Sequence, residues 1–233
     1  RERKRNPSSM NNLNHIAFIM DGNGRWGLKK RRSRNYGHLE GVKTVQEIVK
    51  VSISLKIPVI TFYVFSSENW KRPKSEINYL FNLIKIYFKQ EINNIIKNKI
   101  RINILGRLKE LPIEIKKTLK LAIKKTKQNK NLTINLAINY GSRNEIIDSV
   151  KKLNSMTKKI TEKNITTNLY TKTSFPDILI RTGGQKRLSN FMLWQLAYAE
   201  IFFLEKLWPD FSRNDLVKII KKYHKIKRNY GAV

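Results

Sequence analysis

Residues 15–27 read His-Ile-Ala-Phe-Ile-Met-Asp-Gly-Asn-Gly-Arg-Trp-Gly, an apolar run that ends abruptly in a polar, glycine-rich turn. The apolar part, residues 16–20, has the length of a buried strand, and an Asp-Gly pair is typical of a turn. In open α/β sheets, ligands bind just beyond the carboxyl ends of the strands. The stretch therefore predicts an α/β fold with a site beside Asp21.

The rest of the chain continues this alternation. Runs rich in β-branched and aromatic residues predict strands at residues 57–65, 101–105, 132–138 and 177–180. Apolar residues at helical spacing predict helices at residues 42–55, 76–100, 113–127 and 144–153. This order argues for an open, mostly parallel sheet flanked by helices. We expect residues 1–14 to form a flexible basic N-terminal segment without a signal peptide, and residues 15–233 to form a single domain.

Polar clusters follow four of the predicted strands, at residues 21–25, 66–72, 140–143 and 181–189. Because the carboxyl ends of parallel strands meet at one edge of a sheet, we expect these clusters to converge. They contain several arginines and hydroxyl groups and very few acids. Since guanidinium groups bind phosphate oxygens in bidentate fashion, the clusters predict an anionic, phosphate-bearing ligand.

The composition of the chain restricts the possible functions less than the polar clusters do. The 233 residues include 48 Lys and Arg against 17 Asp and Glu, a formal net charge of +31. This charge favours an anionic partner, which could be nucleic acid, a phosphate-bearing small molecule or anionic lipid. Much of the excess charge comes from lysine, a bias that is typical of drift in base composition, so the charge alone is a weak indication of function. The chain has no cysteine, which excludes disulfides, thiolate zinc sites and cysteine nucleophiles, and no apolar run long enough to indicate a membrane span.

Gly22, Gly24 and Gly27 match the G-x-G-x-x-G pattern of a dinucleotide-binding loop. That interpretation requires an amphipathic helix to begin inside the motif, but residues 28–34 are basic and lack an amphipathic pattern. We favour a phosphate cradle, in which glycines let backbone N–H groups approach diphosphate oxygens. Asp21 would then hold Mg²⁺, although an Asp-Gly pair that only caps a turn is equally consistent with this residue alone.

Residues 15–26 resemble the opening motif of the cis-prenyltransferase family, whose bacterial members include undecaprenyl diphosphate synthases. The resemblance continues through Arg34 and residues 37–38, through Phe-Ser-Ser-Glu-Asn-Trp-Lys-Arg-Pro at 65–73, and through Asn-Tyr-Gly at 139–141. It returns in Asp-Ile-Leu-Ile-Arg-Thr-Gly-Gly at 177–184 and in the blocks 187–195, 198–200 and 207–211. These blocks follow the family order and contain rare residues, so we do not attribute the match to chance.

The resemblance implies a Mg²⁺-dependent enzyme that condenses isopentenyl diphosphate onto an allylic diphosphate, with farnesyl diphosphate expected as primer. The expected product is undecaprenyl diphosphate, a cell-wall lipid carrier. The implied fold is undecaprenyl diphosphate synthase-like, with an apolar tunnel. The implied assembly is a homodimer formed through residues 190–211. A cytoplasmic location is implied, peripheral contact with the inner face of the membrane is left open, and no specific nucleic acid is expected.

The same resemblance assigns roles to single residues. Asp21 would bind Mg²⁺ and assist departure of the allylic diphosphate, Glu200 would complete the metal site, and Asn69 would remove or relay a proton. The residues expected to bind substrate are Gly22, Asn23, Gly24, Arg25, Trp26, Arg34, His38, Ser66, Ser67, Glu68, Trp70, Arg72, Arg181, Arg187, Leu188 and Ser189. Within this set, residues 22–25 would cradle the allylic diphosphate, Arg181, Arg187 and Ser189 would hold isopentenyl diphosphate, and residues 66–72 would form a mobile loop.

The sequence departs from the family pattern at one place near the expected metal site. Gln185 stands where the family commonly has an acid, and Lys186 stands where bacterial relatives often carry histidine. The first of these changes removes a negative charge near the metal.

The predicted helix at 76–100 is apolar over more than one stripe, with Leu83, Ile86 and Tyr87 added to its main face. We expect it to line the tunnel, with Ile102 and Ile104 near the floor.

Two other functions remain open on the sequence alone. A nucleic-acid- or nucleotide-binding protein would suit the net charge, although the only basic stretch interleaved with aromatics is residues 26–34. A noncatalytic family member could support a partner subunit. Asp21 and the set Arg181, Arg187 and Ser189 argue against the latter, because these groups have little use without substrate.

Overall fold

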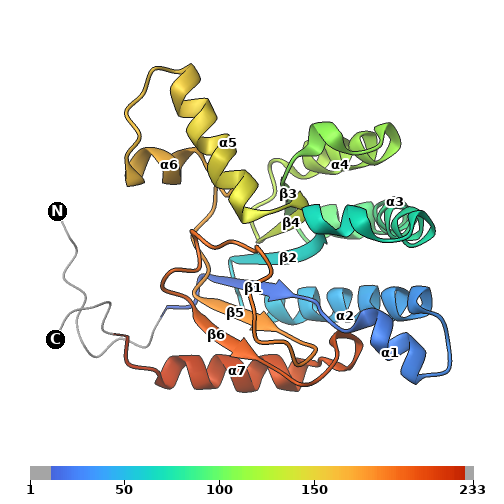
Figure 1. Cartoon of the computed structure of the whole chain (residues 1–233). Helices are drawn as coiled ribbons and strands as arrows, with labels where there is room; N and C mark the ends of the chain where they lie inside the picture. The colour runs from blue at the N-terminus through green and yellow to red at the C-terminus, as the bar shows by residue number, and fades with distance from the viewer. Residues whose placement is uncertain (1–11, 229–233) are drawn as a thin grey trace.

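A computed structural model describes residues 12–228, so the predictions for residues 1–11 and 229–233 lie outside the described residues. Its centre is a six-stranded sheet of order β3-β4-β2-β1-β5-β6, in which every pair of neighbouring strands is parallel. The strands are β1 (His15–Ile19), β2 (Val59–Ser66), β3 (Ile100–Leu105), β4 (Leu132–Tyr140), β5 (Ile178–Arg181) and β6 (Glu200–Phe203). The expected open parallel α/β sheet is confirmed, as Figure 1 shows.

The chain leaves β1 toward β2 on one side and later returns to β5 on the other. Such a reversal leaves a crevice at the carboxyl end of the strand from which the order diverges. The segment that begins at Asp21 lies in this position, directly after β1. The topology alone therefore places the glycine-rich turn where an α/β protein binds its ligand.

Seven α-helices surround the sheet in the described residues: α1 (Asn23–Lys29), α2 (Arg34–Ser54), α3 (Lys74–Lys97), α4 (Ile113–Thr126), α5 (Ser142–Ser155), α6 (Glu162–Asn168) and α7 (Arg213–Lys225). Short 3-10 helices are η1 (Ser67–Lys71), η2 (Leu108–Glu110) and η3 (Trp208–Asp210). None of the helices in residues 12–228 combines the length and apolarity needed to cross a bilayer.

Alternate residues of β1 pack into different parts of the core, as expected for a strand buried on both faces. Ile16 and Phe18 join the larger apolar cluster, to which α2, α3, α4 and α7 contribute. Ala17 and Ile19 join a smaller cluster, which includes Phe191. Part of the segment between β5 and β6 therefore packs against the second face of the sheet.

The structure corrects one argument from the sequence, because a helix does begin inside the glycine motif. The helix α1 has only seven residues and crosses α2 at very close range. A Cβ built on Gly37 would lie 1.9 Å from the carbonyl oxygen of Asn23, and one on Gly27 would lie 2.2 Å from the carbonyl oxygen of Ser33. These glycines serve the packing of α1 on α2, which no amphipathic pattern could reveal.

Candidate active site

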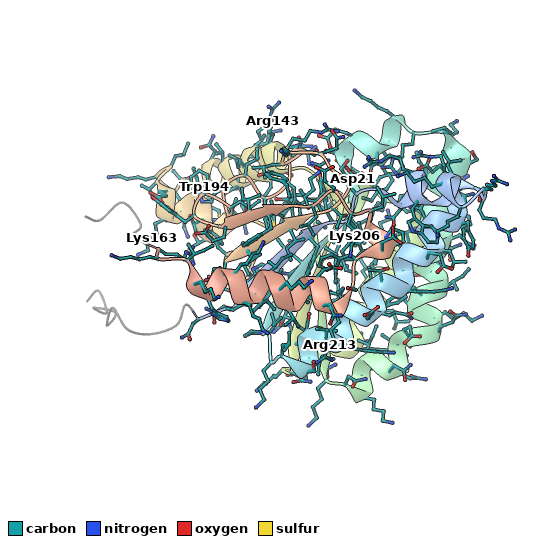
Figure 2. The ribbon with its side chains drawn as sticks, turned by 90° about the horizontal axis from the view of Figure 1, so that it is seen from below. Asp21, Arg143, Lys163, Trp194, Lys206 and Arg213 are labelled. Atoms are coloured by element: carbon teal, nitrogen blue, oxygen red, sulfur yellow. The ribbon has the colours of Figure 1, made fainter. Side chains whose placement is uncertain are left out.

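A polar cavity of about 650 Å³ lies at the carboxyl edge of the sheet, and each of the four polar clusters contributes to its wall. The predicted site residues that line it are Asp21, Asn23, His38, Ser66, Glu68, Asn69, Arg72, Arg181, Arg187 and Ser189. The convergence expected from the strand order is thus observed. Figure 2 shows Asp21 toward one end of the sheet, with Trp194 and Lys163 toward the other.

Asp21 is held between two guanidinium groups. Its Oδ2 accepts a hydrogen bond from Nη2 of Arg181 at 2.9 Å, and its Oδ1 accepts one from Nη2 of Arg25 at 3.2 Å. Its backbone carbonyl accepts from the hydroxyl of Thr182 at 2.8 Å. The next residue, Gly22, has φ +108°, and a Cβ there would lie 2.7 Å from Leu207. The carboxylate is therefore fixed at the cavity wall while its side chain stays 29% exposed.

Arg181, Arg187 and Ser189 form one connected unit. The side chain of Arg181 is 4% exposed and donates through Nη1 to Oγ of Ser189 at 2.8 Å and to the carbonyl oxygen of Arg187. Nη1 of Arg187 donates to Oε1 of Gln185 at 2.6 Å. Ser189 has φ +49°, in the left-handed region. Gln185 thus orients Arg187 without neutralising its charge, which an acid at this position would do.

A second cluster of cations surrounds Glu76, a residue that the sequence did not single out. Glu76 accepts from Nη1 of Arg72 at 3.1 Å, from Nε of Arg34 at 3.3 Å and from Nη2 of Arg34 at 3.4 Å. Nε2 of His38 lies 3.3 Å from the same carboxylate. Three residues expected to bind substrate therefore share one largely buried counterion. The signal available in the sequence was the i,i+4 spacing from Arg72 to Glu76.

Burial controls the charge states in this cluster. Burial raises the pKa of Glu76, but Arg34, Arg72 and His38 together outweigh it and hold the pKa below its usual value. Burial lowers the pKa of His38, and the hydrogen bond with Glu76 only partly opposes this effect. Glu76 is thus an anion and His38 is neutral at physiological pH.

The segment η1 is anchored at both ends. The backbone N–H of Ser66 donates to Oδ1 of Asn69 at 3.1 Å, so the Asn69 amide caps the segment while it also lines the cavity. Nε1 of Trp70 donates to Oδ1 of Asn139 at 2.8 Å, and the indole packs on Phe65. The expected substrate loop is therefore tied to β4 by Trp70.

Several predicted residues lie beside the cavity and do not form its wall: Gly22, Gly24, Arg25, Trp26, Arg34, Ser67, Trp70 and Leu188. The guanidinium of Arg34 packs against Gly24, where a Cβ would lie 2.7 Å from its carbon. Trp26 stacks on Tyr36 with ring centroids 5.9 Å apart and donates to Asp210 at 2.7 Å. Residues of the wall that the site prediction missed are Ile19, Met20, Tyr63, Val64, Leu80, Arg143 and Asn190.

Within one chain, Glu200 does not lie beside Asp21, with which the resemblance implies a shared metal site. Glu200 begins β6 and pairs with Ile178, at the amino end of β5, whereas Asp21 lies beyond the level of Arg181. Oε1 of Glu200 lies 3.7 Å from Nε of Arg228. Motif order in the sequence could not reveal that Glu200 is the first residue of β6, with three strand residues between it and the carboxyl edge.

The side chains that could donate oxygen or nitrogen ligands near Asp21 determine how a metal could bind. In residues 12–228, no three His, Asp or Glu side chains are grouped closely enough to hold an ion. Mg²⁺, however, usually keeps several waters and is held by one or two carboxylates together with substrate phosphates. Asp21, at the wall of a cavity lined by arginines, fits a Mg²⁺ ion that binds together with a diphosphate.

An apolar cavity of about 140 Å³ adjoins the polar one, and both share Met20, Asn23, His38, Val64 and Leu80 as lining residues. Residues of α2, α3, β2 and β4, together with Trp208 of η3, form the rest of its wall. The prediction that α3 lines an apolar space through Leu83 and Tyr87 is confirmed. Ile86 was wrongly included, because it is 41% exposed on the outer face of the helix. Ile102, which is 2% exposed, and Ile104 belong to the core instead.

The comparisons with known proteins agree with this geometry. The family model described as "Putative undecaprenyl diphosphate synthase" matches residues 19–231. An isoprenyl transferase of Rickettsia bellii is 45% identical over 225 residues, which cover 95% of this chain and 99% of the relative. One from Oceanobacillus iheyensis is 44% identical over 227 residues, covering 94% of this chain and 90% of the relative.

Solved structures show the same architecture. The crystal structure of "a probable undecaprenyl diphosphate synthase" from Campylobacter jejuni has a TM-score of 0.83 and 36% identity, covering 95% of this chain and all of that one. Lavandulyl diphosphate synthase from Lavandula x intermedia, solved with dimethylallyl diphosphate, has a TM-score of 0.90 and 29% identity, covering 94% of this chain and 98% of that one. The chain therefore belongs to the undecaprenyl diphosphate synthase family and is a cis-prenyltransferase.

Proposed function

We propose that the enzyme condenses isopentenyl diphosphate onto an allylic diphosphate, with farnesyl diphosphate as the primer. One observation carries this proposal: a polar cavity lined by Asp21 and several arginines shares its wall with an apolar cavity. A prenyl diphosphate needs this combination, with cations around its head and an apolar wall around its chain. A nucleotide would need hydrogen-bonding partners where the apolar cavity has aliphatic and aromatic side chains.

The two diphosphates divide the polar cavity between them. Arg181, Arg187 and Ser189, already joined by hydrogen bonds, hold isopentenyl diphosphate. The turn at residues 22–25 cradles the allylic diphosphate, with Arg34 and His38 beside it. Fixed cations of this kind stabilise negative charge that develops on a leaving group, because they need no reorganisation as the bond breaks. Arg143, which also lines the cavity, adds a further positive charge.

Asp21 would hold Mg²⁺ together with diphosphate oxygens. The metal, when bound, neutralises charge on the leaving diphosphate and so supplies Lewis-acid assistance. Asp21 is at present paired with Arg25 and Arg181, which must share it with the metal or turn to the phosphates.

Condensation also releases a proton from isopentenyl diphosphate. Asn69 lines the cavity, and its amide oxygen already accepts from the Ser66 backbone. An amide oxygen is too weakly basic to keep a proton, so we assign Asn69 a relay role in which the proton passes to a diphosphate oxygen. The segment η1 then closes over both substrates, pivoting where Trp70 meets Asn139.

The chain grows into the apolar cavity, which extends between α2 and α3 as elongation proceeds. We propose undecaprenyl diphosphate, the lipid carrier of cell-wall synthesis, as the product. The enzyme acts as a homodimer in the cytoplasm. The dimer face comprises Phe175, Leu193, Tyr198 and Ile201, which are all at least 36% exposed and lie on or near a cavity of about 680 Å³ at the amino end of β5.

The test is a product assay with purified full-length protein, Mg²⁺, farnesyl diphosphate and labelled isopentenyl diphosphate. We expect a butanol-extractable polyprenyl product whose length is read by thin-layer chromatography, and loss of the product when Mg²⁺ is chelated. A protein that folds and binds both diphosphates yet forms no product would contradict the proposal. In that case the noncatalytic role would be correct.

A further inference from the structure

The basic stretch at residues 26–34 has no part in the reaction beyond Trp26 and Arg34, and it occupies a distinct place in the structure. Lys29, Lys30, Arg31 and Arg32 are the only four consecutive cations in the chain, and no acid occurs between Asp21 and Glu40. All four side chains are exposed. They form the end of α1 and the loop to α2, which Figure 1 shows at the outer end of the molecule, beyond the carboxyl ends of the strands.

An exposed leucine accompanies these cations. Leu28 is 55% exposed and directly precedes Lys29. The close contact of α1 with α2 is made through Gly24 and Gly27, where a Cβ would clash, and Leu28 lies outside this contact. A large apolar side chain fixed in water next to four cations is a feature of surfaces that bind an apolar layer with an anionic boundary.

The aromatic residues of the hairpin are engaged with one another. Trp26 and Tyr36 stack, Nζ of Lys30 lies 5.4 Å from the Trp26 ring centroid, and the guanidinium of Arg32 lies 6.0 Å from that of Tyr36. Proteins that bind single-stranded nucleic acid need aromatic faces on which bases can stack. Both rings are already engaged by this stacking and by a cation each, although Tyr36 is still 37% exposed, whereas Leu28 is 55% exposed. The observations therefore favour a lipid surface over a nucleic acid.

We propose that the tip of the α1–α2 hairpin, residues 28–32, docks the enzyme on the surface of a membrane rich in anionic lipid. The cations lie among the headgroups, and Leu28 enters the boundary with the acyl chains. This inference rests on the proposed function, because the hairpin begins at the Asp21 turn and a docked tip places the prenyl diphosphate site next to a layer that can dissolve the product.

The absence of native cysteine permits a direct test on the full chain. Leu28→Cys and Leu121→Cys each create a single labelling site for an environment-sensitive nitrobenzoxadiazole dye. Leu121 is the matched control: it is 52% exposed on α4 and is likewise flanked by exposed lysines, Lys120 and Lys124. On addition of vesicles of phosphatidylcholine containing phosphatidylglycerol, we expect dye emission to rise at position 28 and to stay unchanged at position 121.

Binding is measured by vesicle co-sedimentation. We expect the variant Leu28→Ser, Lys29→Gln, Arg31→Gln to bind at least about thirtyfold more weakly, as the loss of two surface cations and an apolar side chain predicts. The matched variant Leu121→Ser, Lys120→Gln, Lys124→Gln should bind like the parent, and both variants should keep turnover on detergent-dispersed substrates. Equal dye responses at the two positions would show that overall charge alone drives binding and would overturn the proposal. A response at position 28 to single-stranded RNA, but not to vesicles, would also overturn it.

The two proposals can fail separately. A protein that makes polyprenyl product but shows no dye response at position 28 contradicts the docking surface alone. A protein that docks through position 28 but makes no product contradicts the proposed reaction and leaves the docking surface supported.

Discussion

At the scale of single residues, Asp21 is the most informative position. We predict that Asp21→Asn, which keeps the shape and one acceptor oxygen but removes the charge, lowers turnover about 10²–10³-fold. The physical reason is that Asp21 is the carboxylate expected to hold Mg²⁺, and in residues 12–228 it belongs to no group of three His, Asp or Glu side chains that could hold the ion without it. Steady-state kinetics at saturating Mg²⁺ measure the effect, and urea unfolding confirms that the variant stays folded.

Asp210→Asn is the matched control for Asp21→Asn. Asp210 accepts a hydrogen bond from Trp26 near the same edge of the sheet but does not line the cavity. This variant should retain most of its turnover. An Asp21→Asn enzyme that works as fast as the parent would remove the proposed metal role.

Arg187 tests the division of the two diphosphate sites. Its guanidinium lines the polar cavity, and Gln185 orients it without neutralising it. We predict that Arg187→Ala raises the KM for isopentenyl diphosphate by at least tenfold, as expected for the loss of a charge-assisted hydrogen bond, and changes the KM for farnesyl diphosphate much less. Separate titration of the two substrates measures this difference, and equal shifts would refute the split assignment.

At this scale, the sequence predicted which residues belong to the site better than it predicted which groups surround each of them. Arg181 and Ser189 lie together as predicted, because both belong to the polar cluster at 181–189 that follows β5 at the carboxyl edge. The place of Glu200 in the fold could not be predicted, because it depends on the register of a strand that the sequence did not reveal. Glu76 was missed, because a single acid at the start of a helix gives no sign of the two arginines and the histidine that fold around it.

At the scale of elements, Glu76 joins α2, η1 and α3. We predict that Glu76→Gln lowers the free energy of unfolding by about 1–3 kcal/mol, because Arg34 and Arg72 lose their shared counterion in a partly buried place. The variant should also raise the KM for the allylic substrate, since these cations would no longer be held beside its diphosphate. Urea unfolding and substrate titration measure the two effects.

Glu91→Gln provides the comparison within the same helix. Glu91 accepts hydrogen bonds only from the neutral amides of Gln46 and Asn94 among the contacts described for it. The substitution should change the free energy of unfolding by less than about 0.5 kcal/mol. If both glutamine variants were equally stable, Glu76 would not organise these three elements.

The predicted elements show which signals a sequence carries. The strands β1 to β5 and the helices α3 to α5 were found within a few residues, because each has a long apolar run or periodicity, whereas α2 begins at Arg34, eight residues before the predicted start at 42. The strand β6 was missed, since four residues in an aromatic-rich stretch have no readable period. The helix α7 was overlooked despite a clear signal, a capping box formed by Ser212 and Asp215.

At the scale of the whole molecule, the aromatic-rich stretch at 190–211 contains both buried and exposed apolar residues. Phe191 and Met192 are fully buried in the core of their own chain, so only some of its apolar residues can serve a partner. Ile201 is 39% exposed on β6, which forms an edge of the sheet. An exposed apolar side chain on an edge strand is a natural place for a second copy to pair.

We predict that Ile201→Lys converts a dimer into a monomer of 27.5 kDa, because a charge would be buried without a partner in a symmetric interface. Sedimentation velocity measures the change. Leu121→Lys, at a more exposed leucine of α4, should leave the dimer intact. A parent protein that already sediments as a monomer would exclude the proposed dimer.

The stability of the whole fold should depend on pH through His15. This histidine is fully buried in β1, with Nδ1 near the carbonyl of Ser174 and Nε2 near the hydroxyl of Thr61. Burial lowers the pKa of His15 from 6.5 to about 4, and the contact with Ser174 only partly opposes this. The native protein therefore keeps His15 neutral in a range where the unfolded chain protonates it.

The sign of the effect follows from this difference. Because the unfolded state binds the extra proton, the stabilising contribution of the neutral ring is complete above pH 6.5 and is lost as the pH falls from 6.5 to about 4. At pH 5 the expected loss is about 2 kcal/mol relative to pH 8. Urea unfolding at both pH values should show this loss in the parent, and it should largely disappear in a folded His15→Gln variant. If the variant loses as much stability on acidification as the parent, the pH dependence must come from other groups.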